Sequence, residues 1–138
     1  IKFPRPMLNK PNYEFSFSGL KTSVLYYLRD NPLVVSRKSL VADVCASFQQ
    51  AVIDVLVGKT IRAAREFGAQ SVLLSGGVAA NKTLRAALAG AAKKERMDFF
   101  VPPFEYNTDN AAMIAAAVYL ARLRKKKYPL RANSNLGL

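Results

Sequence analysis

The spacing of apolar residues along the chain predicts helices that alternate with short strands. Over residues 13–18, large apolar side chains alternate with small or polar ones, which is the period of a half-buried strand. Elsewhere apolar residues recur every three or four positions, as on one face of a helix. The short continuous apolar run 71–75, bounded by turn residues, predicts a fully buried strand, and 98–102 predicts another short strand. The predicted strands cover 13–18, 71–75 and 98–102, and the predicted helices cover 20–30, 39–67, 80–96 and 109–127.

Residues that commonly begin or end helices support these limits. Ser39 is a candidate N-terminal cap of the long helix, and Gly68 is placed to end it. Asn31 followed by Pro32 ends the first helix. Cys45 falls among the apolar residues of the long helix, so we expect it in the core.

Short buried strands between helices are typical of α/β proteins, in which helices pack on a largely parallel sheet. Three strands are fewer than most sheets contain, so we expect the sheet to be incomplete in this chain alone. No repeat or linker divides the sequence, and we therefore treat residues 1–138 as a single domain. Residues 128–138 are largely polar, and we expect them to form a loosely ordered tail.

Composition and charge narrow the classes of function. The chain has 21 Lys and Arg but nine Asp and Glu, a net charge of +12 that favours contact with nucleic acid. The basic stretch 122–131 fits either phosphate contact or a solvated tail. The chain contains no histidine, which excludes a histidine-dependent triad or histidine metal ligand within it.

The cysteine count and the apolar runs indicate the compartment and exclude some forms of membrane association. A single cysteine excludes an internal disulfide and favours a reducing compartment. The longest apolar run, 111–121, is too short to cross a bilayer, and the first residues do not resemble a signal peptide. We therefore expect a cytoplasmic protein without a membrane partner. Because the chain starts with Ile1, we also expect it to be part of a larger protein.

The first candidate site follows the apolar run 71–75. Gly76 and Gly77 form a turn that lets a ligand approach the backbone, and the helix start behind them favours anions. Asn81, in the first helical turn, is placed to hydrogen-bond a polar group such as a ribose hydroxyl. The alternative is a tight turn in which Asn81 caps the helix.

The second candidate site is Asp109, between a polar loop and an apolar helix. Its carboxylate is a suitable metal ligand. The alternative is a helix N-cap that needs no metal. A third polar group, formed by Ser16, Ser18 and Lys21, surrounds Gly19, but its spacing indicates no particular chemistry.

Four segments occur in this order along the chain: FPRPM (3–7), FSFSGLKT (15–22), SGGVAANKTLR (75–85) and TDNAAMIAA (108–116). Together they resemble the carboxy-terminal part of the TsaD family, the tRNA adenosine threonylcarbamoyltransferases, also known as glycoproteases or O-sialoglycoprotein endopeptidases. Their order along the chain makes the resemblance far more specific than a single glycine pattern, and it is closest to bacterial members.

The resemblance implies the second lobe of an actin-like, sugar-kinase-like and Hsp70-like fold. It also implies an acyltransferase that moves a threonylcarbamoyl group from threonylcarbamoyl-adenylate to the exocyclic amine of the adenosine 3′ of the anticodon. The implied cofactor is one divalent metal ion, iron or zinc, and the nucleotide ligand is threonylcarbamoyl-adenylate or ATP. The implied partners are tRNA, TsaB, TsaE, TsaC and the amino-terminal lobe.

Two positions carry over from the family. Asn81 matches the asparagine that contacts the nucleotide, and Asp109 matches the carboxylate metal ligand. The family's other metal ligands, a His-x-x-x-His pair, belong to the amino-terminal lobe and have no counterpart in this chain. Asn107 stands where many bacterial members have cysteine. The resemblance thus implies one wall of a nucleotide cleft and one metal ligand, without transferase activity in the isolated chain.

Two other functions remain open on sequence grounds. One is an ATP-dependent enzyme of the same superfold, such as a sugar kinase, which the fold alone allows. The other is a non-catalytic module that binds RNA or a partner through its basic surface. Proteolysis is the weakest interpretation, because neither a nucleophile–base pair nor an H-E-x-x-H sequence is present.

Overall fold

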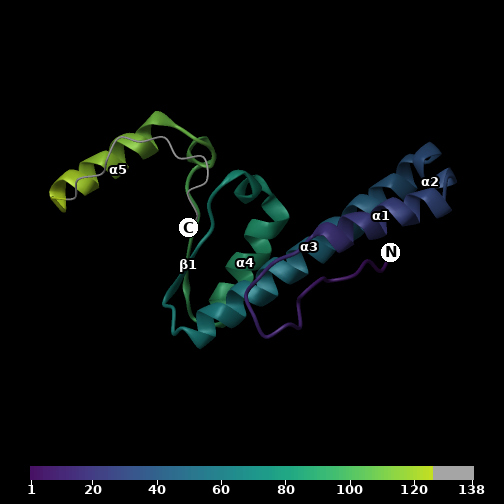
Figure 1. Cartoon of the computed structure of the whole chain (residues 1–138), viewed down its shortest axis with the longest axis horizontal. Coiled ribbons are helices and arrows are strands. Elements are labelled where there is room, and N and C mark those ends of the chain that lie inside the picture. The colour runs from purple at the N-terminus through teal and green to yellow at the C-terminus, as the bar shows by residue number, and fades with distance from the viewer. Residues whose placement is uncertain (126–138) are drawn as a thin grey trace.

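The computed structural model describes residues 1–125, and it is rich in helices with one small sheet (Figure 1). The order of helices and strands matches the order that the sequence predicts, except at the N-terminus and for a short additional helix over 33–36. The helices are α1 (Ser18–Asp30), α2 (Leu33–Ser36), α3 (Lys38–Glu66), α4 (Lys82–Lys94) and α5 (Ala111–Leu123), the strands are β1 (Ser71–Leu73) and β2 (Asp98–Phe100), and the 3-10 turns are η1 (Gly77–Ala80) and η2 (Phe104–Tyr106).

The long helix α3 is the element on which α1, α2 and α4 pack. Near α1 its Val44 and Ala51 join a cluster with Leu20, and farther along Ile53 packs with Leu84 and other α4 residues. Within the described residues, α3 is the helix whose length and composition would allow it to cross a bilayer, with a mean hydropathy of 1.6 over its most apolar window. Its packing explains part of that apolar character.

The end of α3 follows from the predicted glycine. Gly68 adopts a φ of 62°, which residues with a side chain rarely adopt. The amide of Ala69 donates to the carbonyl of Ala64 at 2.8 Å, and the amide of Gly68 donates to Arg65 at 3.2 Å. These two bonds form a Schellman motif, which satisfies carbonyls at the helix end and turns the chain toward β1.

The two strands pair in parallel, with Val72 opposite Phe99 and Leu73 opposite Phe100. Helix α4 connects them and packs against β2, as in a β-α-β unit. The prediction that residues 71–75 are fully buried is wrong, because only Val72 within β1 is buried and Leu73 remains 69% exposed. Within the described residues no second layer covers the face that carries Leu73 and Phe100.

The N-terminal strap, residues 1–17, lies along α3 without a strand of its own. Its carbonyls receive hydrogen bonds from two cations on α3. Lys59 Nζ donates to the carbonyls of Asn12 at 3.1 Å and Glu14 at 2.6 Å. Arg62 donates to the carbonyls of Leu8, Lys10 and Asn12. The strap is therefore held by side chains and not by a neighbouring strand.

The predicted strand over residues 13–18 is consequently wrong. The alternation of large and small side chains does place the large ones on one side of the segment: the rings of Phe15 and Phe17 stack with centroids 6.4 Å apart. No strand among the residues described here pairs with this segment, and α1 already begins at Ser18.

Burial of the Lys59 amine lowers its pKa, although the nearby carbonyls stabilise its charged form.

Two other expectations about α3 are also wrong. Ser39 does not cap the helix, because α3 begins at Lys38 and its N-cap position is Arg37, without a capping side chain. Cys45 is exposed and not in the core, because the apolar face of α3 is wider than the surface that its neighbours cover. The predicted tail, residues 128–138, and the expected continuation of the last helix to Lys127 lie outside the described residues.

Candidate functional site

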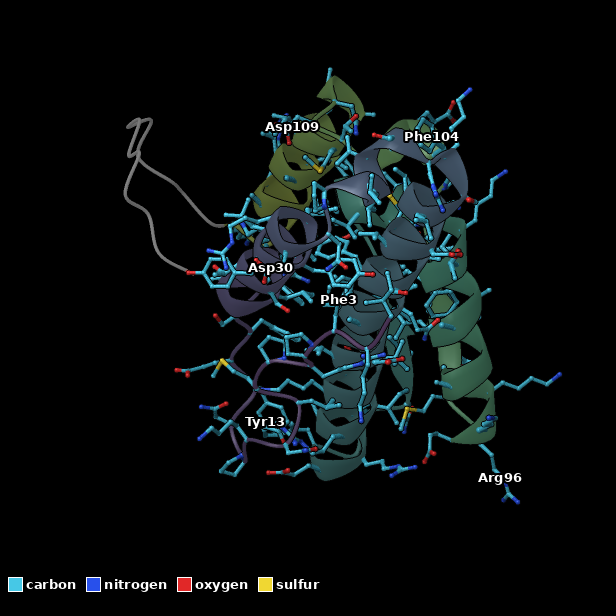
Figure 2. The ribbon with its side chains drawn as sticks, turned by 90° about the vertical axis from the view of Figure 1, so that its right-hand side faces the viewer. Phe3, Tyr13, Asp30, Arg96, Phe104 and Asp109 are labelled. Atoms are coloured by element: carbon cyan, nitrogen blue, oxygen red, sulfur yellow. The ribbon has the colours of Figure 1, made fainter. Side chains whose placement is uncertain are left out.

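The two candidate loops lie at the same edge of the sheet. Because β1 and β2 run in parallel, the segments that follow them leave from adjacent carboxyl ends, which is where α/β proteins usually bind ligands. The amide of Leu74 donates to Phe100 at 2.9 Å and continues the pairing to this edge. Figure 2 shows Asp109 and Phe104 at one end of the molecule, with Tyr13 and Arg96 at the opposite end.

The first loop contains the predicted glycine turn. Gly76 has a φ of 86°, so a side chain there would be strained. A Cβ atom added at Gly76 or Gly77 would meet no atom within 4 Å, which leaves open space for a ligand to approach the backbone. The chain then forms η1 before Asn81, so the α4 helix begins two residues later than the sequence predicts.

Asn81 uses both ends of its carboxamide within the protein. Its Oδ1 accepts a hydrogen bond from the amide of Leu84 at 3.0 Å, which confirms that Asn81 caps α4. Its Nδ2 donates to Oε1 of Gln49 on α3 at 2.9 Å. The side chain also lines an open, mostly apolar pocket of about 280 Å³ between α3 and the start of α4. The contact of Asn81 with a nucleotide stays a prediction.

The second loop separates the two roles considered for Asp109. The residue that caps α5 is Asn110, whose Oδ1 accepts from the amide of Met113 at 2.8 Å. The alternative in which Asp109 is the cap is therefore wrong. Asp109 is exposed at the start of the helix, and its carboxylate has no recorded hydrogen bond or ion pair within residues 1–125.

Asp109 fits the role of one metal ligand but does not form a metal site in this part of the chain. Among the described residues, no three His, Cys, Asp or Glu side chains gather where they could hold a metal ion. A metal bound at Asp109 would thus need ligands from residues beyond those described. The role of Asp109 as a metal ligand also stays a prediction.

Sequence reasoning assigned no function to Asn107, which the structure shows as unusual. This residue is only 4% exposed, and neither Nδ2 nor Oδ1 has a hydrogen-bond partner in the described structure. Buried amides are normally paired, so the second loop carries an uncompensated polar group next to Asp109. No sequence signal marks it, because burial of a loop residue depends on contacts that a pattern does not encode.

The cap and ligand roles of Asn81 can be separated by substitution. In the full-length protein, Asn81→Asp keeps an oxygen that caps α4. The amide of Gln49 can turn over and donate to the new carboxylate, so we expect a stability close to wild type in urea denaturation. The substitution removes the amide donor, and we expect affinity for the nucleotide ligand that the family resemblance implies to fall by about 1–3 kcal/mol in calorimetry. Asn81→Ala removes both the capping oxygen and the amide donor, and it should also lower the free energy of unfolding by about 1 kcal/mol. Unchanged affinity in both variants would leave Asn81 with the cap role alone.

Comparison with known proteins identifies matching sequences over most of the chain. A family model described as "TsaD: tRNA N6-adenosine threonylcarbamoyltransferase" matches residues 1–116, which include Asn81 and Asp109. Proteins with the name tRNA N6-adenosine threonylcarbamoyltransferase are 54% identical over 128 residues in Desulfotalea psychrophila and 46% identical over 136 residues in Thermotoga neapolitana. These matches cover 90% and 99% of this chain, but only 37% and 40% of the relatives.

Proposed function

Since the chain belongs to the TsaD family, we propose that it forms part of a tRNA N6-adenosine threonylcarbamoyltransferase. The enzyme would move a threonylcarbamoyl group from threonylcarbamoyl-adenylate to the exocyclic amine of the adenosine 3′ of the tRNA anticodon. The observation that supports this most is the family match over residues 1–116, within which both candidate loops leave one edge of the sheet. The relatives bear the names of tRNA-modifying enzymes and not of sugar kinases.

The chemistry assigns a limited role to this chain. The adenosine amine forms a bond to the carbamoyl carbon, the bond from that carbon to the adenylate phosphate oxygen breaks, AMP leaves with that oxygen, and the amine releases one proton. The Gly76–Gly77 backbone gives the nucleotide room to approach, and Asn81 stands at the same loop to orient it. Asp109 would hold an iron or zinc ion, which supplies positive charge beside the acyl-adenylate when it is bound.

Other parts of the proposal extend beyond this chain. The small parallel sheet with a connecting helix is compatible with an α/β lobe, and we assign it to the second lobe of an actin-like fold. The chain spans about 40% of the length of the curated relatives it matches. The other lobe, TsaB, TsaE and TsaC would complete a cytoplasmic system that acts on tRNA, to which the basic surface of this chain contributes.

A transfer assay on the full-length protein tests this function. We expect full-length protein to move labelled threonylcarbamoyl from the adenylate onto unmodified tRNA in the presence of its partner proteins. We expect the 138-residue chain alone to give no turnover, because it offers a single candidate metal ligand. A full-length protein without activity would overturn the proposal, and turnover by the chain alone would show that the site is complete within it.

A further inference from the structure

An apolar groove lies between α1, α2 and α3, and it adjoins the pocket that Asn81 lines, because Cys45 and Phe48 line both. Its volume is about 460 Å³, and its apolar lining comes from Val24, Leu28, Val35, Val41, Val44 and Phe48. Figure 1 shows α1 and α3 side by side at this end of the molecule, with α2 beyond them. Apart from these two shared residues, the groove is lined by side chains of α1, α2 and α3 that do not line the pocket beside Asn81.

The walls of the groove have the spacing of a helix-binding seam. On α1, Lys21, Val24 and Leu28 are three and four residues apart, and on α3 the groove residues repeat the same spacing over 41–48. Each set forms one ridge along its helix. Two such ridges side by side accept a third helix, whose apolar side chains enter between them.

The groove is open to solvent on the side formed by α2 and the outer face of α1. Val35 is 70% exposed, and Leu25 beside the α1 ridge is 64% exposed. None of the residues described here covers these side chains. Exposed apolar residues that line a concave surface indicate a binding site more than scattered surface residues do. The concave shape also favours an inserted helix over a flat bilayer surface.

The charged residues around the groove indicate which charge the partner's residues should carry. Lys21 lines the groove, and the exposed Lys38 lies at the start of α3, about 70° around the helix from its ridge. The nearby carboxylates point elsewhere, because Asp30 and Asp43 lie about 150° around their helices from the ridges. The rim is therefore positive, which favours acidic residues on the partner.

We propose that this groove binds an amphipathic helix of a partner protein, with its apolar face between α1 and α3 and acidic residues beside Lys21. An RNA would gain little from this lining, which is almost wholly apolar. The inference rests on the groove and its rim, and it does not depend on the transferase reaction.

A peptide-binding experiment on the full-length protein tests the inference. The probe is a fluorescein-labelled helical peptide of about 18 residues, with Leu and Ala on one face and Glu on its flanks. The matched control peptide has Lys in place of Glu. We expect the acidic peptide to bind about tenfold more tightly than the basic one in fluorescence anisotropy. Equal binding of the two, or no binding of the acidic peptide, would overturn the proposal.

Three variants place the binding at the groove. Val35→Asp should weaken the binding of the acidic peptide about tenfold. Lys21→Glu should reverse the preference, so that the basic peptide binds more tightly than the acidic one. Ile114→Asp, on the exposed helix α5, adds the same charge at an equally apolar position and should change nothing. All three positions are exposed, and circular dichroism checks that the variants fold. An equal loss with Ile114→Asp, or binding of anionic lipid vesicles that Val35→Asp abolishes, would contradict a helical partner.

Discussion

Replacing Asp109 with Asn in the full-length protein is expected to give a folded enzyme that loses metal and transferase activity together. The substitution leaves the helix cap intact, because Asn110 and not Asp109 caps α5. It removes the negative charge that a hard or borderline cation prefers. Loss of several kcal/mol of charge stabilisation corresponds to a fall in turnover of about 100-fold or more. Metal analysis and a tRNA modification assay measure the two effects on one sample.

The adjacent cap supplies the matched control. Asn110→Ala removes the oxygen that accepts from Met113, so we expect a loss of about 1 kcal/mol in stability with metal content retained. The two neighbouring variants should therefore show opposite patterns. Full metal occupancy and normal turnover in Asp109→Asn would leave Asp109 as an ordinary exposed carboxylate.

Leu20→Ala is expected to have the largest effect on the stability of the 138-residue chain. Leu20 is fully buried in α1 and packs in one cluster with Phe3, Val34 and Val44. Removing its terminal atoms loses their burial and leaves a cavity, which costs about 2–5 kcal/mol. Urea denaturation followed by circular dichroism measures the change. A loss under about 1 kcal/mol would mean that α1 does not pack as described.

Leu73→Ala makes the same chemical change at an exposed position. In the 138-residue chain, Leu73 is 69% exposed on the uncovered face of β1, so its truncation should change stability by less than about 0.5 kcal/mol. The contrast between the two variants separates core packing from a general loss of apolar surface. Comparable losses at both positions would show that the sheet face is covered in solution.

The periodic segments were the part of the fold that sequence could predict. The sequence predicts helix α3 to within one residue at each end, because its apolar spacing runs over 29 residues and Gly68 ends it. The strand over 13–18 failed because period two describes an extended backbone but does not identify its partner. Lys59 and Arg62, far along the chain, provide that partner through their side chains.

The candidate site was located by sequence, but the roles of its residues were not all assigned. The glycine turn and the loop before α5 both follow a strand, so their common edge follows from parallel pairing. Asp109 and Asn110 are equally good caps by residue type, and only the extended backbone of Asn110, with φ −150° and ψ 154°, decides between them. The buried amide of Asn107 arises from tertiary contacts, which no local pattern reports.

The way in which α3 holds the N-terminal strap has a consequence for how this segment tolerates mutation. Lys59 and Arg62 bind main-chain carbonyls at positions 10, 12 and 14, and every amino acid supplies the same carbonyl. Side-chain changes at Lys10 or Glu14 therefore leave these bonds in place, whereas a change at Lys59 removes several at once. In a library of random variants, positions 10 and 14 should therefore accumulate substitutions freely. The selective constraint should fall on the buried Phe3 and on Lys59 and Arg62, which are more than 40 residues away along the chain from the carbonyls they bind.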